Sequence, residues 1–287
     1  MYAPDCLILS MQSFQESLLF LISTPLYVIF IGLEIFISNL HRNHRYTKRG
    51  TIENLYLMLV NLGIDIGMRT VGLIVLMKIF DNQFFHVENI YVYWVLVFLL
   101  QDITFWTMHY VDHRVRLFWA VHVTHHSSEE FNLTVGLRSS IFEPLYRFIY
   151  FIPMVLMGFH PLDIFFVFSL TQLYGIFIHT QYVGKLGFIE WFMATPSHHR
   201  VHHGSNPQYI DKNMGMFLII WDRMFGTFEE EKEPVKYGIT KNLEKHTPTH
   251  VIFHEFENMI RDVKTAPTFK AKLMYIFGPP GWSHLEK

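Results

Sequence analysis

The sequence of 287 residues contains one cysteine, Cys6. A single cysteine excludes an internal disulfide, a cysteine-ligated iron–sulfur cluster and a zinc ribbon. Charged residues are also few, at 17%, and the formal net charge of -2 gives no reason to expect a nucleic-acid partner. Residues 1–16 contain no Lys or Arg, so they lack the charged start of a secretory signal peptide. We therefore expect the first apolar segment to be retained.

The chain is instead rich in apolar residues, which occur in long runs. Hydrophobic residues make up 51% of it and aromatic residues 17%. This composition is typical of an integral membrane protein. Three runs are long enough for the ~20 residues that a bilayer crossing needs, and we predict spans at 17–40, 55–80 and 90–108. A strongly basic loop, 41–49, follows the first span and is predicted to lie in the cytoplasm by the positive-inside rule.

Two shorter apolar stretches, 145–159 and 162–178, are predicted to form a helical hairpin that enters the membrane and returns. The expected fold is therefore an all-α integral membrane protein with about four transmembrane helices, if the hairpin is counted with the three spans. A cytosolic helical cap would carry the polar motifs. We predict N-terminal transmembrane helices in 1–108, a catalytic region in 109–228 and a polar cytosolic C-terminal tail in 229–287.

Histidines are concentrated in three short runs, and the predicted topology brings all three runs and His179 to the cytoplasmic side of the membrane. Spacings of three and four residues place imidazoles on one face of a helix. The runs contain His109 and His113, then His122, His125 and His126, then His198, His199, His202 and His203. In the last run, His202 is in register with His198 and His203 with His199, so the spacing alone leaves two pairings open.

The number of histidines predicts a site for two metal ions, because a structural zinc site normally takes four ligands. Imidazole suits zinc, copper, nickel and iron alike, so the ligand type does not identify the metal. No His-Glu-x-x-His sequence occurs, and the common zinc-peptidase arrangement is absent. A membrane metal transporter is a remote alternative, since transport requires ligands along a path through the bilayer.

The motifs around these histidines resemble the fatty acid hydroxylase and sterol desaturase superfamily. The similarity rests on His-His-Ser-Ser-Glu-Glu-Phe-Asn at 125–132, Pro-Ser-His-His-Arg-Val-His-His-Gly at 196–204 and Ile-Trp-Asp-Arg-Met-Phe-Gly-Thr-Phe at 220–228. Within the superfamily the chain looks most like the alkylglycerol monooxygenase branch and bacterial sterol desaturase family proteins. The similarity covers roughly residues 101–228 and the Gly-Pro-Pro-Gly-Trp sequence at 278–282.

The resemblance implies a membrane-bound non-haem di-iron oxygenase that hydroxylates a lipid C–H bond with O2. An ether lipid, a fatty acyl chain or a sterol-like molecule is the expected substrate, and a desaturase on the same site is the alternative. Neither a dinucleotide fingerprint nor a haem-attachment motif occurs, so electrons must come from a separate redox donor, for which tetrahydrobiopterin is one candidate. The expected location is a bacterial inner membrane or the endoplasmic reticulum, with the histidines facing the cytoplasm. The implied metal ligands are His109, His113, His122, His125, His126, His179, His199, His202 and His203, with His198 as a further candidate.

Several acidic residues lie close to these ligands in the sequence. We single out Glu130 as a catalytic candidate, which could supply a proton or bind a metal. Asp112, between two ligands, is interpreted as solvated. Asp222 is expected to fix the last histidine run against the membrane, and Asp65 and Arg69, four residues apart in the second span, are expected to pair.

Overall fold

The structure is a computed structural model that describes residues 3–285, with the side chains of residues 18, 19 and 21–285. The side chain of Cys6 and the residues at each end, 1–2 and 286–287, lie outside this description. Within the described part of the chain no β-strand forms, and two isolated bridges pair Met193 with Leu218 and Gly204 with Tyr237. The predicted all-α fold is confirmed.

The three predicted spans correspond to three long helices, α1 (Ala3–His41), α2 (Lys48–Phe80) and α3 (Ile90–Arg114). Each contains a segment that is long and apolar enough to cross a membrane. Many of the described apolar side chains on α1 and α2 are exposed, as a lipid-facing surface requires. Thr47 begins α2 by accepting a hydrogen bond from the Gly50 amide, and Asn89 caps α3 in the same way.

The predicted hairpin is also present, although its first arm is not one continuous helix. This arm consists of α5 (Pro144–Arg147), η2 (Phe148–Phe151) and α6 (Ile152–Leu156), and the return is α7 (Pro161–Phe177). The turn between the arms needs a glycine at 158, where φ is +88° and an added Cβ would lie 2.1 Å from the Phe85 carbonyl oxygen.

The main core lies where the hairpin packs against α2 and α3. Its buried side chains include Leu76 from α2, Val97 and Phe105 from α3, and Phe151 and Phe168 from the hairpin. The expected Asp65–Arg69 pair is present, with 3.4 Å between Arg69 Nε and an Asp65 oxygen. Asp65 also accepts a 2.9 Å hydrogen bond from Arg147, so the charges on α2 are tied to the hairpin.

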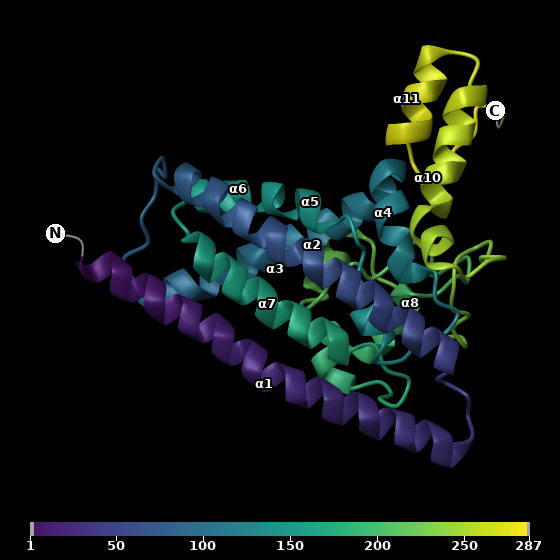
Figure 1. The fold of residues 1–287 in the computed structure, drawn as a ribbon, viewed down its shortest axis with the longest axis horizontal. Helices are drawn as coiled ribbons and strands as arrows, with labels where there is room; N and C mark the ends of the chain where they lie inside the picture. The colour runs from purple at the N-terminus through teal and green to yellow at the C-terminus, as the bar shows by residue number, and fades with distance from the viewer. Residues whose placement is uncertain (1–2, 286–287) are drawn as a thin grey trace.

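Short helices and loops lie at the end of the helix bundle opposite the N-terminus (Figure 1). They include α4 (Arg116–His126), η1 (Val135–Leu137), η3 (Gly187–Trp191), α8 (Pro196–His202) and α9 (Ile220–Phe225). The segment predicted as a polar tail contains two further helices, α10 (Pro248–Thr265) and α11 (Phe269–Phe277). In Figure 1 these two project sideways, across the direction of α1 and α2.

Candidate metal centre

Nine buried or half-buried histidines form two adjacent groups at this end of the bundle. Within each group, ligand atoms lie within 4.8 Å of one another. The first group consists of His109, His113, His122, His126 and His202, and the second consists of His125, His179, His199 and His203. The nine histidines are the same nine that the family motifs imply as ligands. The fold therefore brings together two sets of nitrogens, each large enough to hold one metal ion.

Each group is assembled from several elements. Helix α3 continues past the predicted span end at Met108, so His109 and His113 share a helix with the membrane segment. Helix α4 contributes His122 and His126 to one group and His125 to the other. His179 follows the end of α7, and the remaining ligands come from α8 and its C-terminal residue His203. The i, i+3 and i, i+4 spacing thus explains the convergence within each helix.

Backbone carbonyls orient many of these rings. His109 Nδ1 lies 2.7 Å from the Met214 oxygen, and His125 Nδ1 lies 2.7 Å from the Arg138 oxygen. His179 and His202 make the same kind of contact, with the carbonyls of Gly175 and Lys212. Because a carbonyl can only accept, Nδ1 carries the proton in each ring and Nε2 is left with a free lone pair. In this tautomer Nε2 is the nitrogen available to a metal.

The remaining ring nitrogens also fit a metal. The Nε2 atoms of His109 and His122 are 3.1 Å apart, and those of His179 and His199 are 2.9 Å apart. Among the described residues, the Nε2 atoms of His113, His202 and His203 are buried without a hydrogen-bond partner. Buried polar atoms rarely lack partners, and bound cations would supply them. The histidine clusters therefore fit a metal cofactor.

Burial lowers the pKa of several of these imidazoles and so favours their neutral form. The pKa lies well below its ordinary value for His122, His126, His199 and His203, mainly because these rings are removed from water. Charge repulsion from neighbouring histidines lowers it further. The same desolvation lowers the pKa of His125 to about 4. Neutral imidazole is the form that binds metals, so the fold favours the binding-competent state even at mildly acidic pH.

These pKa values predict how the stability of chelator-treated protein depends on pH. A histidine with a folded pKa of about 4 and an ordinary pKa of 6.5 binds more protons in the unfolded state between these values. Stability should therefore rise as the pH increases from about 4 to 6.5 and then level off. Thermal unfolding of the metal-free protein across this range measures the effect. A melting temperature that falls as pH rises through this window would contradict the assignment of buried neutral rings.

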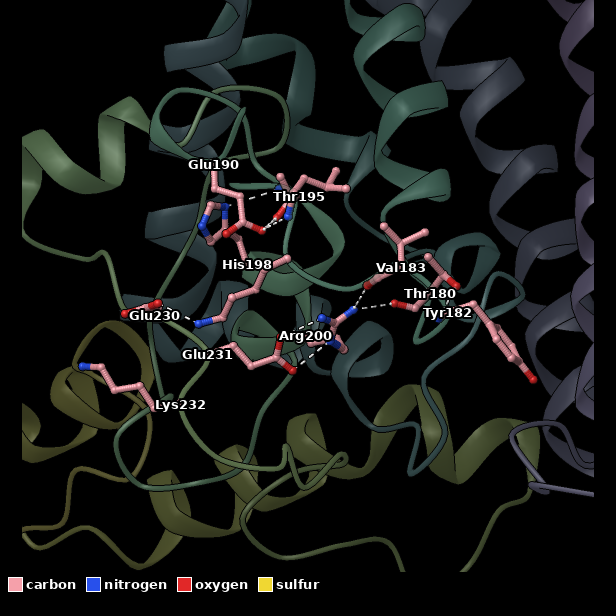
Figure 2. Close-up of polar contacts among 12 residues, drawn as sticks. Thr180, Tyr182, Val183, Glu190, Thr195, His198, Arg200, Glu230, Glu231 and Lys232 are labelled. Carbon is pink, nitrogen blue, oxygen red and sulfur yellow. Dashed lines mark hydrogen bonds and ion pairs between the residues drawn. The ribbon is translucent and has the colours of Figure 1, made fainter. Parts of the chain in front are cut away.

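His198, the undecided candidate, lies in neither histidine group. Its Nδ1 accepts a 3.4 Å hydrogen bond from the Thr195 amide, which forms a capping box at the start of α8. Its ring packs against Phe228, and Figure 2 shows it beside Glu190 and Thr195. Burial lowers its pKa. The geometry therefore places His199, His202 and His203 in the histidine groups and gives His198 a structural position outside them.

Arg200, between these histidines, joins three parts of the site. Its guanidinium makes two bonds to Glu231, at 2.8 and 2.6 Å, and donates to the carbonyl oxygens of Thr180 and Val183 (Figure 2). The loop that follows His179 and the segment after residue 229 are thereby held against α8. The sequence placed Arg200 inside a motif but gave no sign of these partners, since they come from distant segments.

Glu130, the predicted catalytic residue, is not brought to the histidines. Its carboxylate accepts hydrogen bonds from the Thr47 side chain, at 2.5 Å, and from Asn132, at 3.2 Å. It lies against Gly50 in the first turn of α2. This contact joins the basic loop to the segment after α4, and the structure gives Glu130 no described contact with a ligand.

Two other acidic residues lie closer to the metal centre. Asp112, interpreted from the sequence as solvated, is fully buried because its side of α3 faces Tyr146, which donates a 2.8 Å hydrogen bond to it. Its second oxygen lies 3.9 Å from His122 Nδ1. Asp112, His122 and Glu143 together form a third potential ligand group. Sequence spacing could not reveal this group, since Glu143 follows a loop of irregular structure.

A small, partly open hollow of about 70 Å³ adjoins both histidine groups. Histidines from both groups contribute to its wall, among them His109 and His179. Apolar side chains such as Phe105 and Met216 form another part, and Glu143 and Gln172 add polar atoms. A space with ligands on one side and apolar residues on the other can hold a lipid C–H bond next to a metal.

A sequence model described as fatty acid hydroxylase matches residues 94–227 of the chain. Alkylglycerol monooxygenases of Xenopus tropicalis and Homo sapiens are 43% and 41% identical to it over 190 residues, 66% of this chain and 42% of each relative. The Danio rerio alkylglycerol monooxygenase is 35% identical over 268 residues, 91% of this chain and 59% of the relative. An ornithine lipid hydroxylase of Rhizobium tropici is 27% identical over 155 residues, 53% of this chain and 46% of the relative.

The chain thus spans about half the length of the curated relatives that it matches. No solved structure matches it.

Proposed function

Since residues 94–227 place this chain in the fatty acid hydroxylase family, we propose that it is a membrane-bound non-haem di-iron monooxygenase acting on a lipid C–H bond. The observation that carries the proposal is the pair of histidine groups beside one hollow at the end of a membrane bundle. Two irons in these groups would supply O2 activation. In the balanced reaction, the lipid, O2, two electrons and two protons give the hydroxylated lipid and water.

The protein's own part in this reaction is to position and to protect. The carbonyls of Met214, Arg138 and Lys212 would hold His109, His125 and His202 with their Nε2 atoms toward the metals. Phe105 and Met216 would keep water from the reacting carbon. Electrons would come from a separate donor, with tetrahydrobiopterin as a candidate.

An ether lipid is the proposed substrate, because the relatives of 35–43% identity are named alkylglycerol monooxygenases. The metal centre is proposed to face the cytoplasm. The basic loop supports this orientation, since Arg45 stacks on Tyr182 and Thr47 bonds to Glu130, both in segments next to metal ligands. The division into membrane helices, a catalytic region and a C-terminal segment remains a prediction.

Turnover under oxygen-18 gas tests the proposed reaction. Iron-loaded protein in vesicles that contain a 1-O-alkylglycerol and a chemical reductant should incorporate one labelled oxygen atom into the lipid. Hydroxylation of the carbon next to the ether oxygen gives a hemiacetal, which opens to an aldehyde that carries the label. Rapid borohydride reduction of this aldehyde to an alcohol prevents exchange of the labelled oxygen with water, and mass spectrometry detects it. A product that lacks two hydrogens and carries no label would instead identify a desaturase. Absence of any product from a panel of ether, acyl and sterol lipids would contradict both forms of the proposal.

A further inference from the structure

The C-terminal helices carry an exposed apolar face that the proposed reaction does not use. On α11, Phe269, Leu273 and Phe277 are 75%, 40% and 57% exposed, and their spacing of four places them on one face. The opposite face, with Ala271 and Tyr275, is buried against Val263 of α10 and Trp282. Within the described chain, these three apolar side chains therefore remain exposed.

Exposed basic side chains lie on both C-terminal helices. Arg261 and Lys264 on α10, and Lys270 and Lys272 on α11, are all exposed. The nearby carboxylate of Asp262 is already paired with Arg116, at 2.7 Å. An amphipathic helix with apolar and basic surfaces is typical of segments that lie in the interface of an anionic membrane.

The arrangement of the helices agrees with this chemistry. In Figure 1, α10 and α11 extend across the direction of α1 and α2, and α11 lies on the side of α10 that is nearer to α5 and α6. If α1 and α2 cross the bilayer, the two C-terminal helices run along its surface. Because the buried face of α11 packs on α10, its exposed face lies on the side away from α10.

We propose that α10 and α11 form a membrane-surface anchor, whose apolar face inserts among anionic phospholipids of the leaflet nearest the histidines. The anchor is joined to α4 by ion pairs and a hydrogen bond. Arg116 binds Glu255 and Asp262, and its amide donates a 3.0 Å hydrogen bond to the Gly278 carbonyl. Because α4 also carries His122, His125 and His126, the anchor sets the height of the metal centre above the bilayer.

The single cysteine makes this proposal testable by site-specific labelling. In a Cys6→Ser background, Leu273→Cys would carry an environment-sensitive nitrobenzoxadiazole probe, and Lys245→Cys, in an exposed loop, would carry the same probe as the control. The full chain is reconstituted into vesicles of phosphatidylcholine and phosphatidylglycerol. Phospholipids brominated high on the acyl chain should quench the probe at 273 by about half, while the probe at 245 stays unaffected.

Two outcomes would overturn the anchor. One is a probe at 273 with the water-like emission of the control. The other is a blue-shifted probe that brominated lipid does not quench, because a protein surface would then cover this face. In a further variant, Lys270→Glu with Lys272→Glu, quenching at 273 should decrease about twofold in the anionic vesicles but not in pure phosphatidylcholine. If the double variant were quenched as strongly in the anionic vesicles as the protein with both lysines, the proposed attraction between these lysines and anionic lipid would be wrong. None of these measurements needs metal or turnover, so they remain decisive if the proposed reaction fails.

Discussion

Replacing His199 with alanine should empty one of the two metal sites and abolish lipid hydroxylation, while the same replacement at His198 should leave both metals bound. His199 belongs to the four-histidine group, whereas His198 caps α8 through the Thr195 amide. Loss of an outer partner of a ligand typically costs 10–100-fold in metal affinity or activity, so direct loss of a ligand should cost more than about 100-fold. The two residues are neighbours of the same type, which makes this pair a matched comparison.

Metal content by plasma mass spectrometry and turnover of the alkylglycerol lipid measure the two effects. His198→Ala should lower stability by about 1 kcal/mol through loss of the capping contact, without loss of metal. If His198→Ala lost metal as completely as His199→Ala, the choice of register in α8 would be wrong. If neither lost metal, the four-histidine group would not be a metal site.

Replacing Asp222 with alanine should have the largest effect on stability of any substitution outside the ligands. This fully buried carboxylate accepts hydrogen bonds from the amides of Met214 and Gly215, both at 2.8 Å. It also accepts from Trp106 Nε1 at 3.1 Å and from the Thr227 hydroxyl at 2.6 Å. Removal of the carboxylate would leave four buried donors without their acceptor, at a cost of roughly 3–5 kcal/mol.

Loss of the Asp222 carboxylate should also disturb the metal centre, because the Met214 carbonyl orients His109. We expect the apparent melting temperature of the purified protein to fall by roughly 10 °C. Glu244→Ala, in an exposed loop, is the matched control and should leave the melting temperature within error. An unchanged melting temperature for Asp222→Ala would mean that the loop around Met214 is held by other contacts.

The spans, and most of the histidines that gather in the two groups, could be predicted from the sequence because both depend on local periodicity, whereas His179 stands outside the three histidine runs. Apolar runs define α1, α2 and α3, and intervals of three and four residues identify histidines on one helical face. The register of α8 could not be read in this way, since His198 and His199 each have a partner four residues later. Thr195 and Pro196 decide it, because they start the helix and place His198 at its capping position.

Contacts between distant segments were beyond such local patterns. Asp112 looks solvated beside a membrane span, but Tyr146 from the hairpin covers it. Glu130 follows three ligands in sequence, yet the chain turns after α4 and its carboxylate meets Thr47 at the start of α2. The polar composition of residues 229–287 likewise concealed the apolar face of α11, because three exposed residues spaced four apart add little to average hydropathy.

The ratio of metal to protein is the most direct test of the two-site centre. We predict that each wild-type chain binds two iron ions after anaerobic loading, with Mössbauer spectra of two coupled irons. His126→Ala and His179→Ala each remove a ligand from a different group, so each variant should retain about one ion. A wild-type chain that binds one ion, or variants that both keep two, would contradict a centre built from two histidine groups.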